Sequence, residues 1–344
     1  MSEMNLKSDL GWYEQVPKVE LHLHLEGAIP CSALWELVQK YGGDSSLPDL
    51  KTLKSRFEYR DFSHFIETWL WKNQFLREYD DFAFIAEAVA RDLARQNIRY
   101  AEIFYSPPDF TRYGLQTQRL TEAIRKGLSK VLNIEIALVA DLVRDWGPER
   151  AVITLAEVAE VRDLGVIGIG MGGSDQSYPA ELFTAIYEDA RRHGFHTTAH
   201  TGEVGGAGSI WDVIHHLRVE RIGHGTHAIE DGRLVDYLAR EQIPLEVCPI
   251  SNVQTGVVKS IDEHPVRRYF ERGLVVTINT DDPQMFGNSL AEEYRLLEER
   301  LGFSRKEICT LILQGISASW LSQDKKQHLI NSFVHEPTWL EDKS

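Results

Sequence analysis

Residues 18–25 read KVELHLHL, and this stretch decides the fold. Apolar side chains occupy every second position, as along a β-strand, whose successive side chains point to opposite faces of a sheet. The same alternation puts His22 and His24 on one face, with Cα atoms about 6 to 7 Å apart. Because two imidazoles at that spacing can reach one ion, the stretch predicts a strand that ends in a metal site.

Seven further runs of this kind follow, each ending in polar or Gly-rich residues and each followed by helical spacing of apolar residues. Several are almost continuously hydrophobic, as expected for parallel strands covered on both faces. Eight alternations of strand and helix favour a closed (β/α)8 barrel over an open doubly wound sheet, which has the same local pattern. The eight runs are residues 18–25, 98–106, 135–145, 166–173, 195–203, 220–226, 243–249 and 275–283.

Periodicity and terminal signals predict the helices. Residues 82–96 carry an apolar stripe at positions 82, 85, 89 and 93, and Ser304 with Glu307 makes a capping box for a helix at 304–316. Pro265 marks the start of a helix at 264–270. Additional helices are expected within 31–96 and 289–334. Because no linker or repeat interrupts the chain, residues 1–344 are expected to form a single domain with a flexible tail at 336–344.

The composition excludes several classes of function. The chain has 344 residues, 43% of them apolar, and a formal charge of −15, which suits a globular protein that binds neither nucleic acid nor anionic membranes. Its three cysteines form no CxxC pair, which argues against a disulfide framework or a thiolate metal site. There is no apolar signal segment and no window of 18 successive apolar residues, so we expect a cytoplasmic protein.

Histidine and acidic residues gather at the ends of the predicted strands, where (β/α)8 barrels build their active sites. His200 ends the fifth run, and Asp281 and Asp282 end the eighth. With His22 and His24, His200 and Asp281 make a nitrogen and oxygen set suited to one Zn²⁺, with Fe²⁺, Mn²⁺ and Co²⁺ as alternatives. Each residue alone is more often structural, but their joint position at one rim indicates a metal site.

The other histidines are interpreted as structural, because they fall on predicted helices, element starts or the tail, and His227 is left open. The structural set is His64, His193, His196, His215, His216, His264, His328 and His335.

Glu203 and His224 are the candidates for proton transfer. Glu203 lies three residues after His200 in the loop that leaves the same strand, and His224 ends the sixth strand. A carboxylic acid beside the metal can give a proton to a substrate nitrogen while water, made acidic by the metal, attacks the adjacent carbon. His224 could steer or deprotonate that water. The structural alternative for Glu203 is a charge near the N-terminus of the next helix.

Other catalytic motifs are absent from the chain. Residues 202–208 lack the Lys-Ser/Thr of a phosphate loop, and there is neither HExxH nor GxSxG. His24-Leu25-Glu26 matches the HxE of cytidine-type deaminases, but no PCxxC follows. The fourth strand has no Lys or Glu that could bridge two metals, so one ion is expected.

Six motifs, taken in order, resemble the adenosine deaminase group of the amidohydrolase superfamily. They are VELHLHLEGA (19–28), YSP (105–107), HTGE (200–203), RIGHG (221–225), CPISN (248–252) and NTDDP (279–283). The resemblance implies a (β/α)8 barrel with one zinc ion on His22, His24, His200 and Asp281. It also implies hydrolytic deamination of a 6-aminopurine nucleoside, adenosine or deoxyadenosine first, to inosine or deoxyinosine and ammonia.

The resemblance gives individual residues a role. Glu203 would protonate N1 of the purine, and His224 and Asp281 would orient the hydroxide that attacks C6. Asp282 would bond N7, and a backbone donor at Gly173 would meet N3. The residues by themselves indicate a metal, a water and a proton donor, and only the resemblance supplies the purine.

One departure from the family pattern bears on the substrate. Adenosine deaminases usually have Asp, which reaches the ribose 5′-hydroxyl, where this chain has Glu26, and Glu is common there in adenine deaminases. The segment DDPQMFG (281–287) is similar to relatives that act on larger nucleosides, including aminodeoxyfutalosine. Adenine and aminodeoxyfutalosine are therefore the alternative substrates, and a noncatalytic purine-binding protein or another amidohydrolase is the alternative function.

Two groups of residues complete the expected substrate site. His24 is expected beside the purine as well as on the metal. The aromatic segment 57–75 is interpreted either as a lid over the purine, with Phe62, Phe65 and Trp69 nearest, or as an ordinary core stripe at helical spacing.

Overall fold

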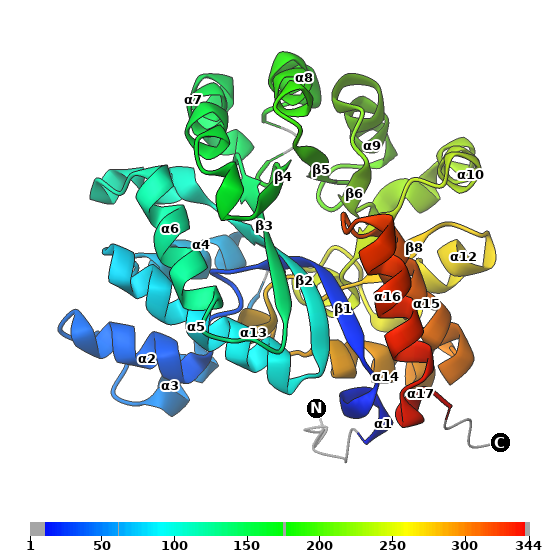
Figure 1. Cartoon of the computed structure of the whole chain (residues 1–344), viewed down its shortest axis with the longest axis horizontal. Coiled ribbons are helices and arrows are strands. Elements are labelled where there is room, and N and C mark those ends of the chain that lie inside the picture. Colours follow the sequence, from blue (N-terminus) through cyan, green and yellow to red (C-terminus); the bar gives the residue numbers. More distant parts are fainter. Residues whose placement is uncertain (1–10, 61, 175–176, 341–344) are drawn as a thin grey trace.

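The computed structural model describes residues 11–60, 62–174 and 177–340, with all their side chains except those of Phe62 and Leu340. Eight parallel strands follow one another in the order β1 to β8, and helices surround them (Figure 1). The (β/α)8 barrel predicted from the sequence is confirmed. No described helix has both the length and the apolar composition needed to cross a bilayer.

The strands are covered on both sides, and every residue of β1, β6, β7 and β8 is buried. Their buried residues include charged and imidazole side chains, such as Lys18 and Glu20 in β1 and Arg221 in β6, beside the apolar ones. The strands are β1 (Lys18–His24), β2 (Ile98–Tyr105), β3 (Glu135–Asp141), β4 (Val166–Gly170), β5 (His196–Thr201), β6 (Arg221–His224), β7 (Leu245–Val247) and β8 (Val276–Ile278).

The helices follow the predicted pattern. In α5 the stripe of Phe82, Ile85, Val89 and Leu93 is buried, and the helix begins earlier than predicted because Glu78 caps it. The capping box at the start of α15 is confirmed. The described helices include α1 (Trp12–Gln15), α2 (Cys31–Lys40), α3 (Leu50–Ser55), α4 (Phe62–Asn73), α5 (Tyr79–Arg95), α6 (Thr117–Leu128), α7 (Gly147–Ala159), α8 (Thr184–Arg192), α9 (Ala207–Asp212), α10 (Gly232–Glu241), α11 (Pro249–Gln254), α12 (Val266–Glu271), α13 (Pro283–Phe286), α14 (Leu290–Leu301), α15 (Arg305–Ala318), α16 (Gln323–Val334) and α17 (Pro337–Leu340).

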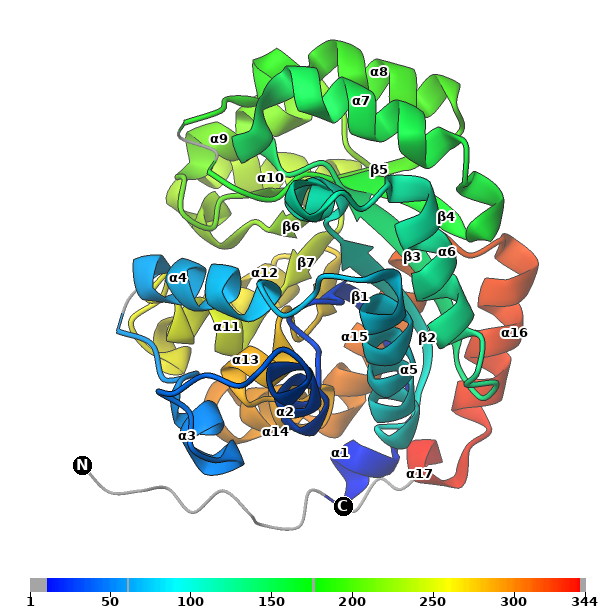
Figure 2. The same cartoon turned by 90° about the vertical axis from the view of Figure 1, so that its left-hand side faces the viewer.

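The two ends of the described chain meet outside the barrel. Figures 1 and 2 both show α1 beside α17, and the indole Nε1 of Trp12 donates a hydrogen bond to the carbonyl of Thr338 at 2.7 Å. The sequence predicts a flexible tail at 336–344, but a docked helical turn occupies its first part. Residues 341–344 lie outside the described residues.

The ring closes through polar residues just after β8. The backbone N–H of Asp281 donates to the carbonyl of His22 at 3.0 Å, and the N–H of His24 donates to the carbonyl of Asp281 at 2.9 Å. The side-chain oxygen of Asn279 accepts from the N–H of Leu21 at 2.9 Å. Closure of the barrel therefore places Asp281 against the two histidines of β1.

Several strands end earlier than predicted. The runs 135–145, 195–203 and 275–283 leave the sheet after Asp141, Thr201 and Ile278. Their last residues are polar, and the chain turns over the rim there. Glu203 lies in the loop after β5, as predicted, and Asp282 lies in the loop after β8.

Candidate active site

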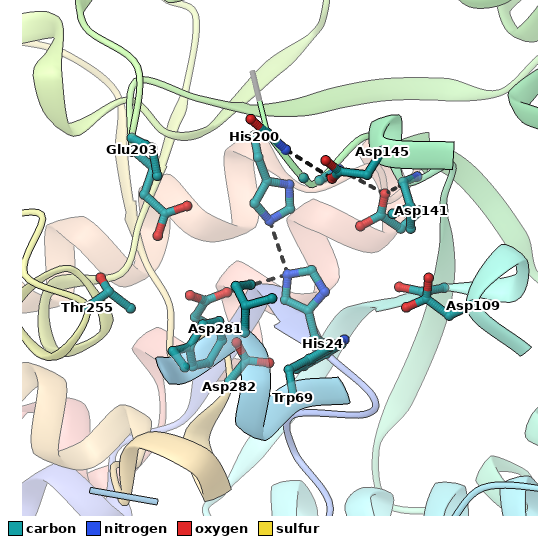
Figure 3. A pocket seen from close by; sticks show the side chains of 18 of the residues that line it. His24, Trp69, Asp109, Asp141, Asp145, His200, Glu203, Thr255, Asp281 and Asp282 are labelled. Carbon is teal, nitrogen blue, oxygen red and sulfur yellow. Dashed lines mark hydrogen bonds and ion pairs between the residues drawn. The ribbon is translucent and has the colours of Figure 1, made fainter. Parts of the chain in front are cut away.

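A cavity of about 460 Å³ opens at the carboxyl ends of the strands (Figure 3). Among the predicted site residues whose side chains are described, only His22 and Glu26 are outside its lining. The cavity is deep enough for His24 and His224 to be at least 90% buried. A cavity of this size holds a ligand larger than a few atoms.

Three imidazole nitrogens and a carboxylate oxygen converge beside this cavity. The Nε2 atom of His200 lies 2.9 Å from Nε2 of His22 and 3.1 Å from Nε2 of His24. Oδ1 of Asp281 lies 3.5 and 3.4 Å from the same atoms of His22 and His24. The hydroxyl of Ser251 donates to the other carboxylate oxygen of Asp281 at 2.6 Å, which leaves Oδ1 for the cluster.

The donor atoms of this set fit one divalent cation. Bare imidazole nitrogens at such short separations repel one another unless a proton or a metal ion lies between them. Three nitrogens and one carboxylate oxygen are the ligands that zinc prefers in catalytic sites. His224 also lies close, because its donor atom is within 4.8 Å of those of His22, His200 and Asp281.

The charges around the cluster favour a cation. Burial lowers the pKa of His22, but hydrogen bonds to Asp281 and Glu246 outweigh it and raise that pKa to about 10. Burial lowers the pKa of His24 to about 3 and also lowers that of His200. Without a metal, the extra proton on His22 gives the cluster one positive charge. A divalent ion would displace that proton and take its place.

Two site residues have left-handed backbone conformations. His224 has φ 60° and Asp281 has φ 64°, a region that residues with a side chain rarely adopt. Such a conformation costs about 1 to 3 kcal/mol and persists where the surroundings enforce it. At the ends of β6 and β8 it allows the chain to turn while both side chains stay at the cavity.

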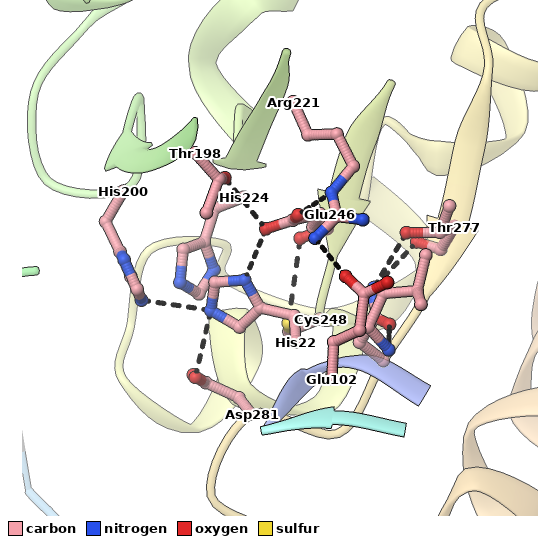
Figure 4. Close-up of polar contacts among 12 residues, drawn as sticks. His22, Glu102, Thr198, His200, Arg221, His224, Glu246, Cys248, Thr277 and Asp281 are labelled. Atoms are coloured by element: carbon pink, nitrogen blue, oxygen red, sulfur yellow. Dashed lines mark hydrogen bonds and ion pairs between the residues drawn. The ribbon is translucent and has the colours of Figure 1, made fainter. Parts of the chain in front are cut away.

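A chain of buried ionic contacts runs behind His22 (Figure 4). Nδ1 of His22 lies 2.8 Å from Oε2 of Glu246, whose other oxygen accepts from Nε of Arg221 at 2.6 Å. The guanidinium of Arg221 also pairs with Glu102 at 2.6 Å and stacks on Trp320 at 3.6 Å. Because a carboxylate only accepts hydrogen bonds, Glu246 keeps a hydrogen on Nδ1 of His22, and Nε2 is the nitrogen that would lose its hydrogen to bind a metal.

The charge state of Glu246 follows from the same contacts. Burial raises the pKa of Glu246. The charge of Arg221 and the hydrogen bond to His22 lower that pKa by more than burial raises it, so the net pKa is below the usual value of a glutamate. Glu246 is therefore a carboxylate at neutral pH. Glu246 is not among the site residues predicted from the sequence, although a charged residue within the apolar run 243–249 is a usable signal.

Glu203 and Asp282 project into the cavity near the cluster (Figure 3). Oε2 of Glu203 lies 3.6 Å from Nε2 of His224, a separation that a bridging oxygen atom would span. Burial and the charge of Asp281 hold the pKa of Asp282 well above its usual value. A Cβ atom on Gly27 would lie only 1.6 Å from Oδ1 of Asp282, so this close approach requires glycine.

Glu26 lies behind the cavity wall. Its Oε1 accepts a hydrogen bond from the N–H of Ser106, a residue that lines the cavity, at 3.0 Å. Burial raises the pKa of Glu26, and the buried ammonium of Lys72 opposes that rise. Lys72 lies 3.7 Å from the centre of the Trp69 ring. Glu26 is thus placed to act on a ligand through Ser106, which lines the cavity.

Helix α4 supplies both a core stripe and a cavity wall. The ring of Phe65 stacks on Phe286 at 5.2 Å, and Trp69 meets the ring of His24 edge-on at 5.9 Å. Phe65 and Trp69 also line the cavity, so the helix contributes to the cavity wall as well as to the core, and a lid over a purine stays a prediction. The side chain of Phe62 is outside the described residues.

One wall of the cavity is acidic, and exposed apolar side chains surround its opening. Figure 3 shows Asp109, Asp141 and Asp145 across His24 and His200 from Glu203. No lysine or arginine occurs among the described residues that line the cavity. Four exposed apolar side chains also line it, namely Ile66, Leu70, Trp146 and Val204.

Fold and site together define a (β/α)8 hydrolase of the amidohydrolase superfamily, with a buried His and Asp group that fits a metal ion. The family model described as Adenosine deaminase matches residues 17–336, and the chain belongs to that family. It is therefore a hydrolase that acts on cyclic amidines, of a family that is typically metal-dependent.

Curated relatives share the reaction but differ in the purine. The chain is 34% identical over 318 residues to an adenine deaminase of Chlorobium phaeobacteroides, which covers 92% of this chain and 95% of the relative. It is 36% identical over 332 residues to an aminodeoxyfutalosine deaminase of Streptomyces avermitilis, with 94% and 92% covered. The chain accordingly catalyses hydrolytic deamination of a 6-aminopurine.

Solved structures are similar over almost the whole chain. A zinc-bound amidohydrolase from Burkholderia ambifaria aligns with a TM-score of 0.87 and 26% identity, covering 97% of this chain and 94% of that one. An arabidopsis ADAL complexed with GMP aligns with a TM-score of 0.84 and 26% identity, covering 94% and 97%.

Proposed function

We propose that this protein is a zinc-dependent deaminase of unphosphorylated 6-aminopurine nucleosides, with adenosine and deoxyadenosine as the first substrates. The observation that carries the proposal is the single cavity wall that combines His24, His200 and Asp281 with Glu203 and Asp282. The nitrogen and oxygen donors suit zinc, held by His22, His24, His200 and Asp281. When bound, such an ion lowers the pKa of a water molecule to about 7 and so supplies a nucleophile.

The other side chains fit the two edges of a purine. Glu203 donates its proton to N1, which makes C6 more electrophilic. The water oxygen then bonds to C6, one of its protons returns to Glu203 and the other goes to the amino group, and ammonia leaves as the C6–N bond breaks. N7 is a lone-pair acceptor and needs a donor, which the carboxyl of Asp282 supplies because burial and Asp281 favour its protonated form. The backbone N–H of Gly173, in the cavity lining, is available for N3.

Size and charge support a nucleoside. A cavity of about 460 Å³ has room for a sugar beside the base. The acidic wall of Asp109, Asp141 and Asp145 would repel a phosphate, and the lining described here has no Lys or Arg to bind one. The apolar mouth allows an uncharged substituent on the sugar. Ser106, whose N–H donates to Glu26, lines the cavity, and we assign to it the contact with the 5′-hydroxyl.

Side-by-side assays test the proposal. Ammonia release and the ultraviolet spectrum would be followed with adenosine, deoxyadenosine, adenine, AMP and aminodeoxyfutalosine. We expect the first two to have the highest kcat/KM and AMP to be a poor substrate. Preference for adenine or aminodeoxyfutalosine would replace the assigned substrate, and purine binding without ammonia release would contradict catalysis.

Metal content tests the ligand assignment. Asp281→Ala should retain less zinc than the unmodified protein after dialysis, whereas Asp145→Ala, on the opposite wall, should retain as much. Equal zinc in both variants would contradict the assignment of Asp281 as a ligand.

A further inference from the structure

We propose that Asn252, itself oriented by His264, is a positioning residue that keeps a hydrogen on the site-facing nitrogen of His224. His224 then donates a hydrogen bond into the site and does not bind the metal, although its donor atom lies in the four-residue group with His22, His200 and Asp281. This inference rests on the proposed metal-dependent function of the same site.

A backbone group that can only donate fixes the tautomer of His264. The N–H of Val266 donates to Nδ1 of His264 at 3.2 Å, so that nitrogen carries no hydrogen. His264 is 3% exposed, and burial lowers its pKa to about 3, which keeps the ring neutral. A neutral imidazole with a bare Nδ1 carries its hydrogen on Nε2. That nitrogen lies 3.2 Å from Oδ1 of Asn252.

Asn252 passes this orientation to His224. Its Oδ1 accepts a hydrogen bond from Nε2 of His264 and a second one, at 2.9 Å, from the hydroxyl of Thr226. These two donors identify the oxygen end of the amide. The amide nitrogen then lies 3.1 Å from Nδ1 of His224. Because that nitrogen only donates, Nδ1 of His224 accepts, and the hydrogen of this ring is on Nε2. A ring that accepts at Nδ1 and carries its hydrogen on Nε2 is neutral.

The opposite arrangement holds at the neighbouring histidine. Glu246 accepts from Nδ1 of His22 and leaves Nε2 as the nitrogen that can bind a metal, whereas Asn252 donates to Nδ1 of His224 and leaves an N–H on its Nε2. The two rings are only 5.0 Å apart. His22 is thus prepared as a ligand, and His224 as a donor toward any oxygen atom of a bound molecule that enters between His224 and Glu203. Such a preorganised donor stabilises negative charge as it develops on the reacting oxygen.

Replacement of Asn252 by Asp reverses the polarity of this contact with little change of shape. The carboxylate accepts from Nδ1 of His224, whose hydrogen leaves Nε2. We expect kcat to fall about 10²- to 10³-fold, the usual effect of losing one such donor. With Co²⁺ as the probe, the visible absorption of the variant should weaken, because His224 can now join the metal and raise its coordination number.

The decisive readout needs neither substrate nor metal. In ¹⁵N-histidine NMR spectra of the metal-free protein, His224 should show a protonated Nε2 in the unmodified chain and a protonated Nδ1 in Asn252→Asp. Thr226→Val is the matched control, because it removes the second donor to Asn252 but leaves the contacts from His264 to His224. A hydrogen on Nδ1 of His224 in the unmodified protein would overturn the inference, even if Asn252→Asp fails to fold. Failure to deaminate any purine would instead overturn the proposed function and leave this result intact.

Discussion

Replacing Glu246 by Gln should weaken metal binding without touching a metal ligand. The carboxylate now contacts His22 through one oxygen at 2.8 Å and Arg221 through the other at 2.6 Å. An amide has only one oxygen. If the amide oxygen faces Arg221, the amide nitrogen donates to Nδ1 of His22 and moves the hydrogen of that ring to Nε2. If the amide oxygen faces His22, the amide nitrogen lies against the guanidinium of Arg221, and two donors face each other.

The size of the effect follows from the two contacts. Loss of a residue that orients a metal-bound histidine typically lowers metal affinity 10- to 100-fold, which is about 1.4 to 2.7 kcal/mol. Breaking a buried ion pair costs about 3 to 5 kcal/mol of folding stability when the remaining charge has no partner. Arg221 keeps Glu102 and its stacking on Trp320, so we expect a loss of stability below that range.

Glu102→Gln is the matched control, because it alters the same buried chain at the end away from His22. Zinc affinity would be measured by chelator competition, and stability of the metal-free proteins by urea unfolding. We expect both variants to lose stability and only Glu246→Gln to lose the full 10- to 100-fold in affinity. Unchanged zinc affinity in Glu246→Gln, or an equal loss in Glu102→Gln, would refute the reasoning.

Three further perturbations separate the roles within the site. Glu203→Gln should keep its zinc and lose about 10²- to 10⁴-fold in kcat, and near-normal turnover would remove Glu203 from the mechanism. Gly27→Ala should displace Asp282 and lower kcat/KM by about 10²-fold while zinc content stays constant; wild-type kinetics would contradict a role for Asp282. The pKa of His264 is lowered by burial to about 3, so the folded state resists a proton that the unfolded chain takes up as pH falls below about 6.5. Between pH 7 and 5 the unmodified protein should therefore lose about 2 kcal/mol more unfolding free energy than His264→Gln, and parallel urea curves would refute this.

The barrel was predictable because each strand carries its own signal. The alternation in 18–25 and the hydrophobic runs after it specify strands, and the polar residue at the end of each run marks the rim. Residues such as His200 and Asp281 are recognisable because they sit where apolar side chains stop. The sequence could not give the lengths of the strands, since the chain turns over the rim at a point set by contacts such as that between Asp281 and His22.

The residues that orient the site were less visible. Asn252 and His264 come from segments that follow β7, and nothing local shows that they meet His224. His264 was interpreted as structural because a histidine before a helix is common, and its contact with Asn252 depends on how α11 and α12 pack. The acidic wall was also missed, because Asp109, Asp141 and Asp145 are ordinary surface residue types in the sequence and converge only in the folded barrel.

One distribution of charge accounts for both the metal and the choice of substrate. The carboxylates around the cluster raise the pKa of His22 to about 10, so the site holds a positive charge even before a metal arrives. The described cavity lining offers no Lys or Arg to offset the acidic wall, so a phosphate that passes Asp109, Asp141 and Asp145 meets like charge there. A neutral nucleoside has no net charge, so these carboxylates do not repel it as they repel a phosphate. It follows that Asp145→Lys, at a residue that is not a proposed metal ligand, should improve kcat/KM for AMP relative to adenosine and leave zinc content unchanged.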